Sequence, residues 1–93
     1  MKLRFLLNPT TGEPHIRDHE IQEWEVRDVL EQFVENVAAR DGSRAALGQT
    51  RNGRWLRVIY RQDPESNPLF VITAYEPSNN AIRAARRGLR RKR

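Results

Sequence analysis

The sequence predicts an α+β domain in which one main helix packs on a small antiparallel four-stranded sheet, followed by a basic C-terminal helix. Two observations carry this prediction. Between Trp55 and Glu76 lie two runs rich in β-branched and aromatic residues, separated by the turn-forming cluster QDPESNP. Upstream of them is an apolar stripe at helical spacing, formed by Val26, Val29, Leu30 and Phe33. A sheet that covers this stripe gives a two-layer domain.

The two runs predict a hairpin. In the first run, side chains alternate between two faces. One face holds Trp55, Arg57, Ile59 and Arg61, and the other holds Leu56, Val58 and Tyr60. The second group forms the core side, with the Tyr60 hydroxyl at its rim. The run from Leu69 to Ala74 is nearly all apolar, which is typical of a central or doubly covered strand.

Two further strands complete the predicted sheet. Lys2 to Leu7 forms an edge strand that Asn8-Pro9 ends. Ser43 to Thr50 forms the other strand, in which Gly48 marks a bulge or a close approach of another segment. Asn52-Gly53 then makes a tight turn into the hairpin.

The main helix is predicted to begin near Gln22. Ile21 and Val26 have the spacing of a hydrophobic staple, and Glu25 is placed to complete a capping box. We expect the polar side chains to face mainly outward: Glu23, Glu25, Arg27, Asp28, Glu31 and Gln32. Trp24 lies off the apolar stripe, where it forms a lid over the sheet edge or part of a partner surface, and we favour the lid.

Charge divides the chain into two parts. The formal net charge is +5, but residues 83–93 hold seven basic residues and no acid, so the other 82 residues hold 10 basic and 12 acidic ones. We expect one domain over residues 1–80 and a basic helix or tail over residues 81–93, with a weak apolar stripe in the tail. A basic end is typical of a polyanion-binding protein, and also of a frayed end that only aids solubility.

Composition excludes several classes of protein. At 93 residues the chain can bury roughly 60–65% of its unfolded surface, which suffices for one modest core. It has no cysteine, which excludes a disulfide scaffold, and no apolar run that spans a membrane, so we expect a cytoplasmic protein. His15 and His19 are four residues apart, but no third ligand follows at a metal-binding spacing. We expect no metal site and no cofactor.

Two stretches resemble small BrnT-like toxin domains and their relatives of unknown function. Residues 15–30 (HIRDHEIQEWEVRDVL) match the pattern H-I-x-x-H-x-I-x-x-x-E-V-x-x-V-L. Residues 48–60 (GQTRNGRWLRVIY) and 71–76 (VITAYE) resemble G-x-T-x-x-G-R-x-L-x-V-V-Y followed by V-I-T-A. The resemblance covers residues 15–76. It departs from the pattern at Tyr75-Glu76, where those toxins tend to carry a basic residue.

This resemblance implies a RelE-like fold of the RelE/ParE-type toxin superfamily. It further implies the toxin component of a type II toxin–antitoxin system, a metal-independent endoribonuclease that acts on RNA, including ribosome-associated RNA. A cognate antitoxin protein is the implied partner.

RNA cleavage without a metal needs a base for the 2′-hydroxyl, a cation for the phosphorane and an acid for the leaving oxygen. The candidates for these roles are His19, Tyr75, Glu76 and Arg83. Two of them have structural alternatives. His19 also fits a packing residue beside a helix start, and Glu76 also fits an ion pair with Arg83.

Arginines in two places are candidates for nucleic-acid contacts: Arg57, Arg61, Arg86, Arg87, Arg90 and Arg91. The two on the strand also fit a solvated sheet face. Two functions remain open on the sequence: an endoribonuclease toxin, and a noncatalytic domain of the same fold that binds nucleic acid or a protein partner through its basic C-terminus.

Overall fold

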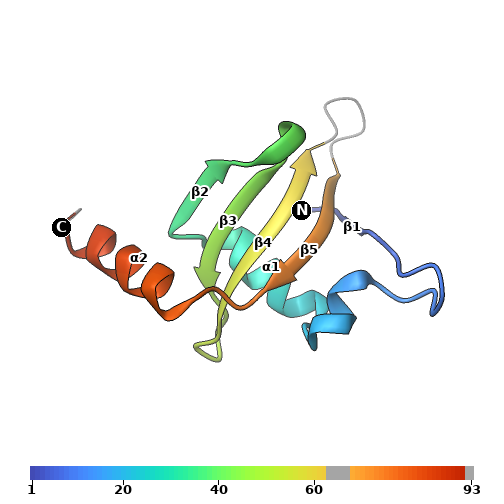
Figure 1. Cartoon of the computed structure of the whole chain (residues 1–93), viewed down its shortest axis with the longest axis horizontal. Helices are drawn as coiled ribbons and strands as arrows, with labels where there is room; N and C mark the ends of the chain where they lie inside the picture. The colour runs from blue at the N-terminus through green and yellow to red at the C-terminus, as the bar shows by residue number, and fades with distance from the viewer. Residues whose placement is uncertain (63–67, 92–93) are drawn as a thin grey trace.

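The computed structural model describes residues 1–62 and 68–91, with side chains as far as residue 89. A five-stranded sheet in the order β1-β5-β4-β3-β2 carries α1 on one face (Figure 1). The strands are β1 (Leu3–Phe5), β2 (Glu35–Ala38), β3 (Arg44–Gln49), β4 (Trp55–Gln62) and β5 (Leu69–Tyr75). The helices are α1 (Glu23–Glu31), α2 (Asn79–Arg91) and the short 3₁₀ helices η1 (His15–His19) and η2 (Arg40–Gly42).

The α+β class is confirmed, but the predicted four-stranded antiparallel sheet is only partly right. Strands β2, β3, β4 and β5 are antiparallel neighbours, whereas β1 pairs in parallel with β5. The fifth strand is β2, whose sequence ENVA has little strand character of its own. This segment forms a strand because it pairs with β3. Residues 63–67 of the turn cluster QDPESNP predicted between the hairpin strands lie outside the described residues.

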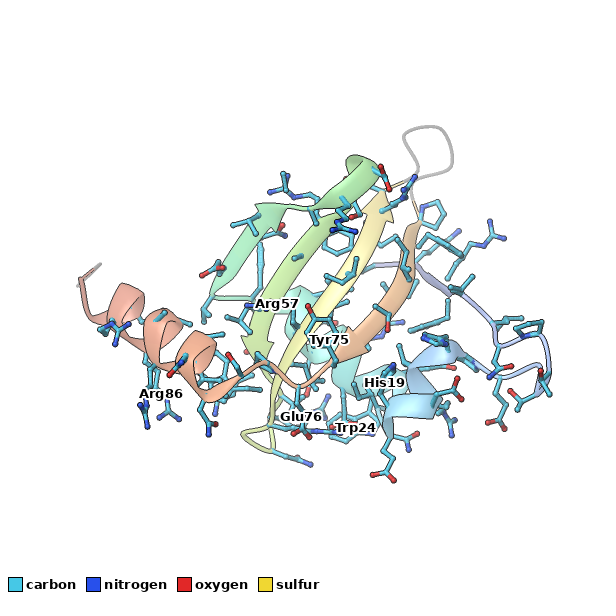
Figure 2. The ribbon with its side chains drawn as sticks, viewed as in Figure 1. His19, Trp24, Arg57, Tyr75, Glu76 and Arg86 are labelled. Atoms are coloured by element: carbon cyan, nitrogen blue, oxygen red, sulfur yellow. The ribbon has the colours of Figure 1, made fainter. Side chains whose placement is uncertain are left out.

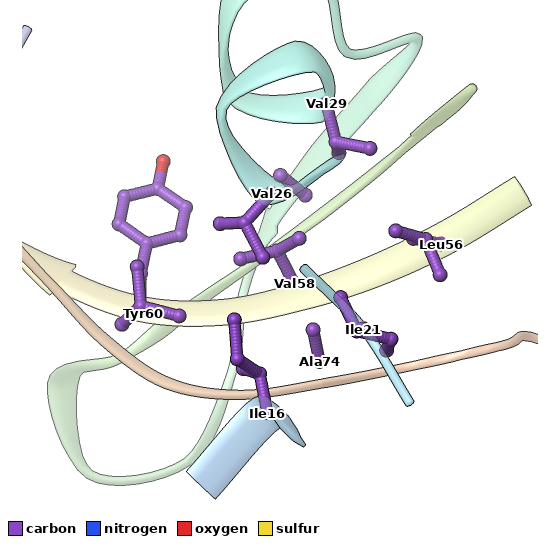
Figure 3. Packing of buried hydrophobic residues seen from close by; sticks show 10 residues of the cluster. Ile16, Ile21, Val26, Val29, Leu56, Val58, Tyr60 and Ala74 are labelled. Atoms are coloured by element: carbon purple, nitrogen blue, oxygen red, sulfur yellow. The ribbon is translucent and has the colours of Figure 1, made fainter. Parts of the chain in front are cut away.

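The core lies between α1 and one face of the sheet (Figure 3). Val26 and Val29 of α1 are fully buried against Leu56 and Val58 of β4. Fully burying each such side chain contributes roughly 1.5–3 kcal/mol to folding. The alternation predicted for β4 is confirmed, and the hydroxyl of Tyr60 accepts a hydrogen bond from Asn36 Nδ2 at 2.6 Å.

The sequence predicts Phe33 on the core-facing stripe of the helix, and this prediction is wrong. Helix α1 ends at Glu31, and the Phe33 side chain is 43% exposed. Gly48 of β3 explains this path. Because Gly48 has no side chain, the chain after the helix passes close against the β3 backbone and continues into β2. A Cβ atom on Gly48 would stand only 3.1 Å from Phe33 Cα. The close approach predicted at Gly48 is therefore confirmed.

Two helix acids expected to face outward are buried instead. Asp28 accepts three hydrogen bonds from Arg51, and Glu25 accepts hydrogen bonds from Arg54. A buried carboxylate is tolerated because it is paired in this way. Glu25 also accepts a hydrogen bond from the Gln22 amide at 2.9 Å, which confirms its predicted capping role.

Trp24 does not form the expected lid over a sheet edge. Its side chain is 40% exposed, and the guanidinium of Arg51, from the turn between β3 and β4, lies 5.4 Å from the ring centroid.

Helix α2 packs on the sheet face turned away from α1, which we name the open face. Ile82 and Ala85 contact Leu47 of β3 and Trp55 of β4. Beyond them the helix extends past the sheet (Figure 1), and Leu89 is 42% exposed. No helix in the described part of the chain combines the length and apolarity needed to cross a lipid bilayer.

Candidate nucleic-acid interface

The open face carries arginines and aromatic rings in two cross-strand rows, with the Ile59–Thr73 row between them. Paired residues on neighbouring strands point to the same side of a sheet, so the register defines the rows. Arg57 of β4 lies opposite Tyr75 of β5. Arg61 lies opposite Phe70, and Phe70 also pairs with Arg4 of β1. In both rows a guanidinium therefore lies beside an aromatic ring.

The Arg57–Tyr75 pair lies near the end of the sheet where β4 begins and β5 ends (Figure 2). Directly opposite residues have Cβ atoms about 4.5–5.5 Å apart, so both polar ends can reach one ligand. Arg57 is half-buried and Tyr75 is 36% exposed. Among the described residues, neither side chain makes a hydrogen bond, an ion pair or a ring contact. Their donors are available to a ligand.

Trp55 and Arg86 extend this surface at the end covered by α2. The Arg86 guanidinium lies 5.8 Å from the centroid of the Trp55 ring, a cation–π contact between α2 and β4. Trp55 is only 9% exposed, and its Nε1 is buried without a hydrogen-bond partner in the described part of the protein. The contact keeps Arg86 close to the sheet at the same end as Arg57.

The other predicted arginines of α2 lie farther along the helix surface. Arg83 and Arg87 are exposed, and neither has an ion-pair partner among the residues described. Arg90 and Arg91 belong to α2 by backbone, but their side chains lie outside the described residues. Of the arginines predicted on α2, only Arg86 is placed at the sheet by a contact within the described part of the chain.

Glu76 forms an ion pair with Arg54, and the alternative pairing with Arg83 is not found among the described residues. Arg54 contacts Glu76 Oε1 through Nη2 at 2.8 Å and Nε at 2.9 Å, and contacts Glu25 Oε2 at 3.1 Å. Burial of Arg54 lowers the pKa of its guanidinium, but the hydrogen bonds and charges of Glu76 and Glu25 outweigh burial and keep this pKa above its ordinary value. The Arg54 cation bridges the end of β5 to the start of α1.

His19 is not assembled with the other residues proposed for catalysis. It lies on η1, where its ring meets the His15 ring edge to face, with centroids 5.4 Å apart at 78°. Within the described residues, no hydrogen bond, ion pair or ring contact joins His19 to Tyr75 or Arg83. The described residues also hold no group of three or more His, Asp or Glu side chains that could bind a metal ion.

Sequence reasoning misses two residues of this surface, Arg4 and Phe70. In the sequence, Phe70 is only part of an apolar run and Arg4 only part of an edge strand. Phe70 faces the same side as Arg61 through the β4–β5 register, and Arg4 joins this row because β1 pairs with β5. Local alternation holds no signal for that partner, since the paired segments lie far apart in the chain.

Comparison with protein-family models, with curated proteins and with solved structures finds no match to this chain. The resemblance to BrnT-like and RelE/ParE-type toxins therefore stays a prediction. A proposal for the function therefore rests on the geometry of the open face.

Proposed function

We propose that this chain binds single-stranded RNA across the open face of its sheet. The observation that carries the proposal is the pairing of a guanidinium with an aromatic ring in two cross-strand rows, Arg57 with Tyr75 and Arg61 with Phe70, on either side of the Ile59–Thr73 row. Proteins bind single strands by stacking bases on aromatic or guanidinium planes while cations hold the phosphates. Each row offers both kinds of group on one face.

Charge on this face supports the proposal. No hydrogen bond or ion pair joins Arg4, Arg57 or Arg61 to an acid in the described part of the chain. Glu35 is the acid that the register places on the same face, and Leu47 separates it from Arg57. A phosphate backbone that runs from Arg86 past Arg57 towards Arg61 follows the direction of β4 and meets cations along it.

The Arg57–Tyr75 pair also supports a second function, the metal-independent endoribonuclease of a toxin–antitoxin system. A guanidinium stabilises the charged phosphorane, and a phenol beside it can exchange a proton with the attacking or the leaving oxygen. His19 and Glu76 are engaged elsewhere, so Tyr75 carries the proton chemistry in this proposal. Such a toxin also needs a protein partner that holds it inactive.

Fluorescence anisotropy with a labelled single-stranded RNA tests RNA binding. We expect Arg57→Ala to weaken binding about five- to tenfold and to reduce the slope of log K against log salt by roughly 0.7, as expected for one lost phosphate contact. The matched control is Arg40→Ala, which removes the same charge from an exposed site on η2.

Two substitutions of Tyr75 distinguish base stacking from general electrostatic attraction of RNA. Tyr75→Phe should keep the affinity because the ring remains, whereas Tyr75→Ala should weaken binding about tenfold. Equal effects of Arg57→Ala and Arg40→Ala, with no effect of Tyr75→Ala, would show that RNA contacts the protein only through its overall charge. Equal affinity for double-stranded RNA would also contradict the proposal.

A further inference from the structure

A groove of about 510 Å³ lies between β2 and α2, beside the open face. One wall is formed by the chain from Phe33 to Val37, and the other by Ala84, Ala85, Gly88 and Leu89. Three large apolar side chains on these walls are well exposed: Phe33 at 43%, Val37 at 46% and Leu89 at 42%. Neighbouring apolar side chains at this exposure are typical of a site that a partner covers.

The sheet side of the groove is an edge. Strand β2 is the last strand in the sheet order, so its outer backbone groups face no neighbouring strand among the described residues. One of these positions is occupied, because Arg44 Nη2 donates to the Asn36 carbonyl at 3.1 Å. The strand carries a single charge, Glu35, and no proline or lysine of the kind that protects an edge from other chains.

The helix side of the groove is positively charged. A helix turns about 100° per residue, so Arg86 and Arg87 flank the lining stripe of α2 on its two sides. Beyond Glu76 the sequence has no acidic residue. A segment that fills the groove therefore meets cations along both borders of the α2 stripe, while Glu35 is the one acid among the described residues that line the groove.

The positive charge of α2 favours some possible ligands of the groove over others. The α2 helix of a second copy would bring the same arginines, and like charges in contact repel. RNA would pair with the arginines, but its hydrophilic backbone leaves the apolar walls around Val37 and Leu89 uncovered. An acidic protein segment with large apolar side chains satisfies both parts of the groove.

We infer that the groove binds an acidic segment of a partner protein, with apolar side chains inserted between β2 and α2. The inference rests on the protein partner of the proposed toxin function and not on RNA binding, and Arg86 is the residue that the two proposed surfaces share. Its contacts are apolar at Phe33, Val37 and Leu89 and electrostatic at Arg86 and Arg87.

Selection from a phage-displayed library of random peptides tests this inference on the full chain. We expect the enriched peptides to combine acidic residues with large apolar ones. A synthetic peptide of the enriched class should bind Val37→Glu at least about tenfold more weakly than wild type, a loss of about 1.4 kcal/mol. The matched control is Ala38→Glu, which adds the same charge at the next exposed position, on the opposite side of the strand from Val37.

Four results would overturn the inference. Enriched peptides without acids or without large apolar residues would show a different chemistry, and equal binding to both glutamate variants would place the peptide elsewhere. Self-association of the wild type in analytical ultracentrifugation that Val37→Glu abolishes would make the groove an interface between copies. RNA affinity of the wild type is measured in parallel. Failed peptide selection with intact RNA binding removes this inference and leaves the RNA proposal standing.

Discussion

Arg51 binds Asp28 through three hydrogen bonds to one buried carboxylate. Nη2 reaches Oδ1 at 2.8 Å, while Nε and the backbone amide both reach Oδ2 at 3.0 Å. The backbone bond matters for the fold because it fixes the first residue of the β3–β4 turn to the middle of α1. The helix and the turn are thereby held in one arrangement, independently of the apolar core.

This pair predicts a pH dependence of stability. Hydrogen bonds from the Arg51 side chain and then its amide lower the pKa of Asp28 below its ordinary value, against an opposing effect of burial. A carboxyl whose pKa is lower in the folded state stabilises the fold above its unfolded pKa, and this stabilisation is lost as the pH falls through the folded pKa. Asp28→Asn should therefore be less stable than wild type at pH 7, with the difference shrinking below about pH 4. Urea denaturation across this pH range measures the difference, and a constant gap would contradict the prediction.

Val29 and Phe33 should respond differently to truncation, although both belong to the predicted helix stripe. Val29 is fully buried, so Val29→Ala should lower the free energy of unfolding by about 2–3 kcal/mol through lost burial and a cavity. Phe33 is 43% exposed and lies beyond α1, so Phe33→Ala should cost less than about 1 kcal/mol. Chemical denaturation of both variants gives the comparison. Equal losses would mean that Phe33 is a core residue after all.

Two glycines offer a matched pair of alanine substitutions. A Cβ on Gly48 would stand 3.1 Å from Phe33 Cα and 3.3 Å from Val29 Cγ1, so Gly48→Ala should destabilise the fold by roughly 1–3 kcal/mol. Gly88 lies inside α2, where an added methyl group would meet nothing within 4 Å, and Gly88→Ala should stabilise by roughly 0.5–1 kcal/mol. Thermal unfolding of both variants decides the signs. A neutral Gly48→Ala would show that β3 can move away from the segment after α1.

The ribonuclease function predicts growth arrest when the chain is expressed alone, with RNA cleaved in the absence of added metal. Tyr75→Phe should relieve the arrest because it removes the hydroxyl while keeping the ring. His19→Ala and Arg83→Ala should not, since neither residue lies at the Arg57–Tyr75 pair. Circular dichroism checks that each variant is folded. If the wild type leaves RNA whole, the ribonuclease proposal fails and only the RNA-binding proposal stands.

The parts of the fold that could be predicted from the sequence are those fixed by near neighbours in the chain. Alternation along β4 places Arg57 and Arg61 on one face because successive strand residues point to opposite sides. The capping role of Glu25 follows from its spacing to Gln22, and the close approach at Gly48 from the absence of a side chain. Each of these signals spans only a few residues.

The parts that could not be predicted depend on partners far along the chain. Glu25 and Asp28 look like solvent-facing helix acids until Arg54 and Arg51 are brought to them by the turn after β3. The same applies to the site. The sequence singles out Tyr75 by its position at the end of a strand. That Tyr75 pairs with Arg57 follows only from the β4–β5 register.

The parallel pairing of β1 with β5 has a consequence for how the chain folds. Leu3 pairs with Leu69, so closing the sheet at this edge joins segments separated by nearly the whole domain. Such a loop costs more conformational entropy than a hairpin does and slows folding. Strand β1 is synthesised well before its partner and stays unpaired until β5 has left the ribosome. We infer that the antiparallel strands β2, β3, β4 and β5 assemble first and that β1 then pairs with β5 as the last step in forming the sheet.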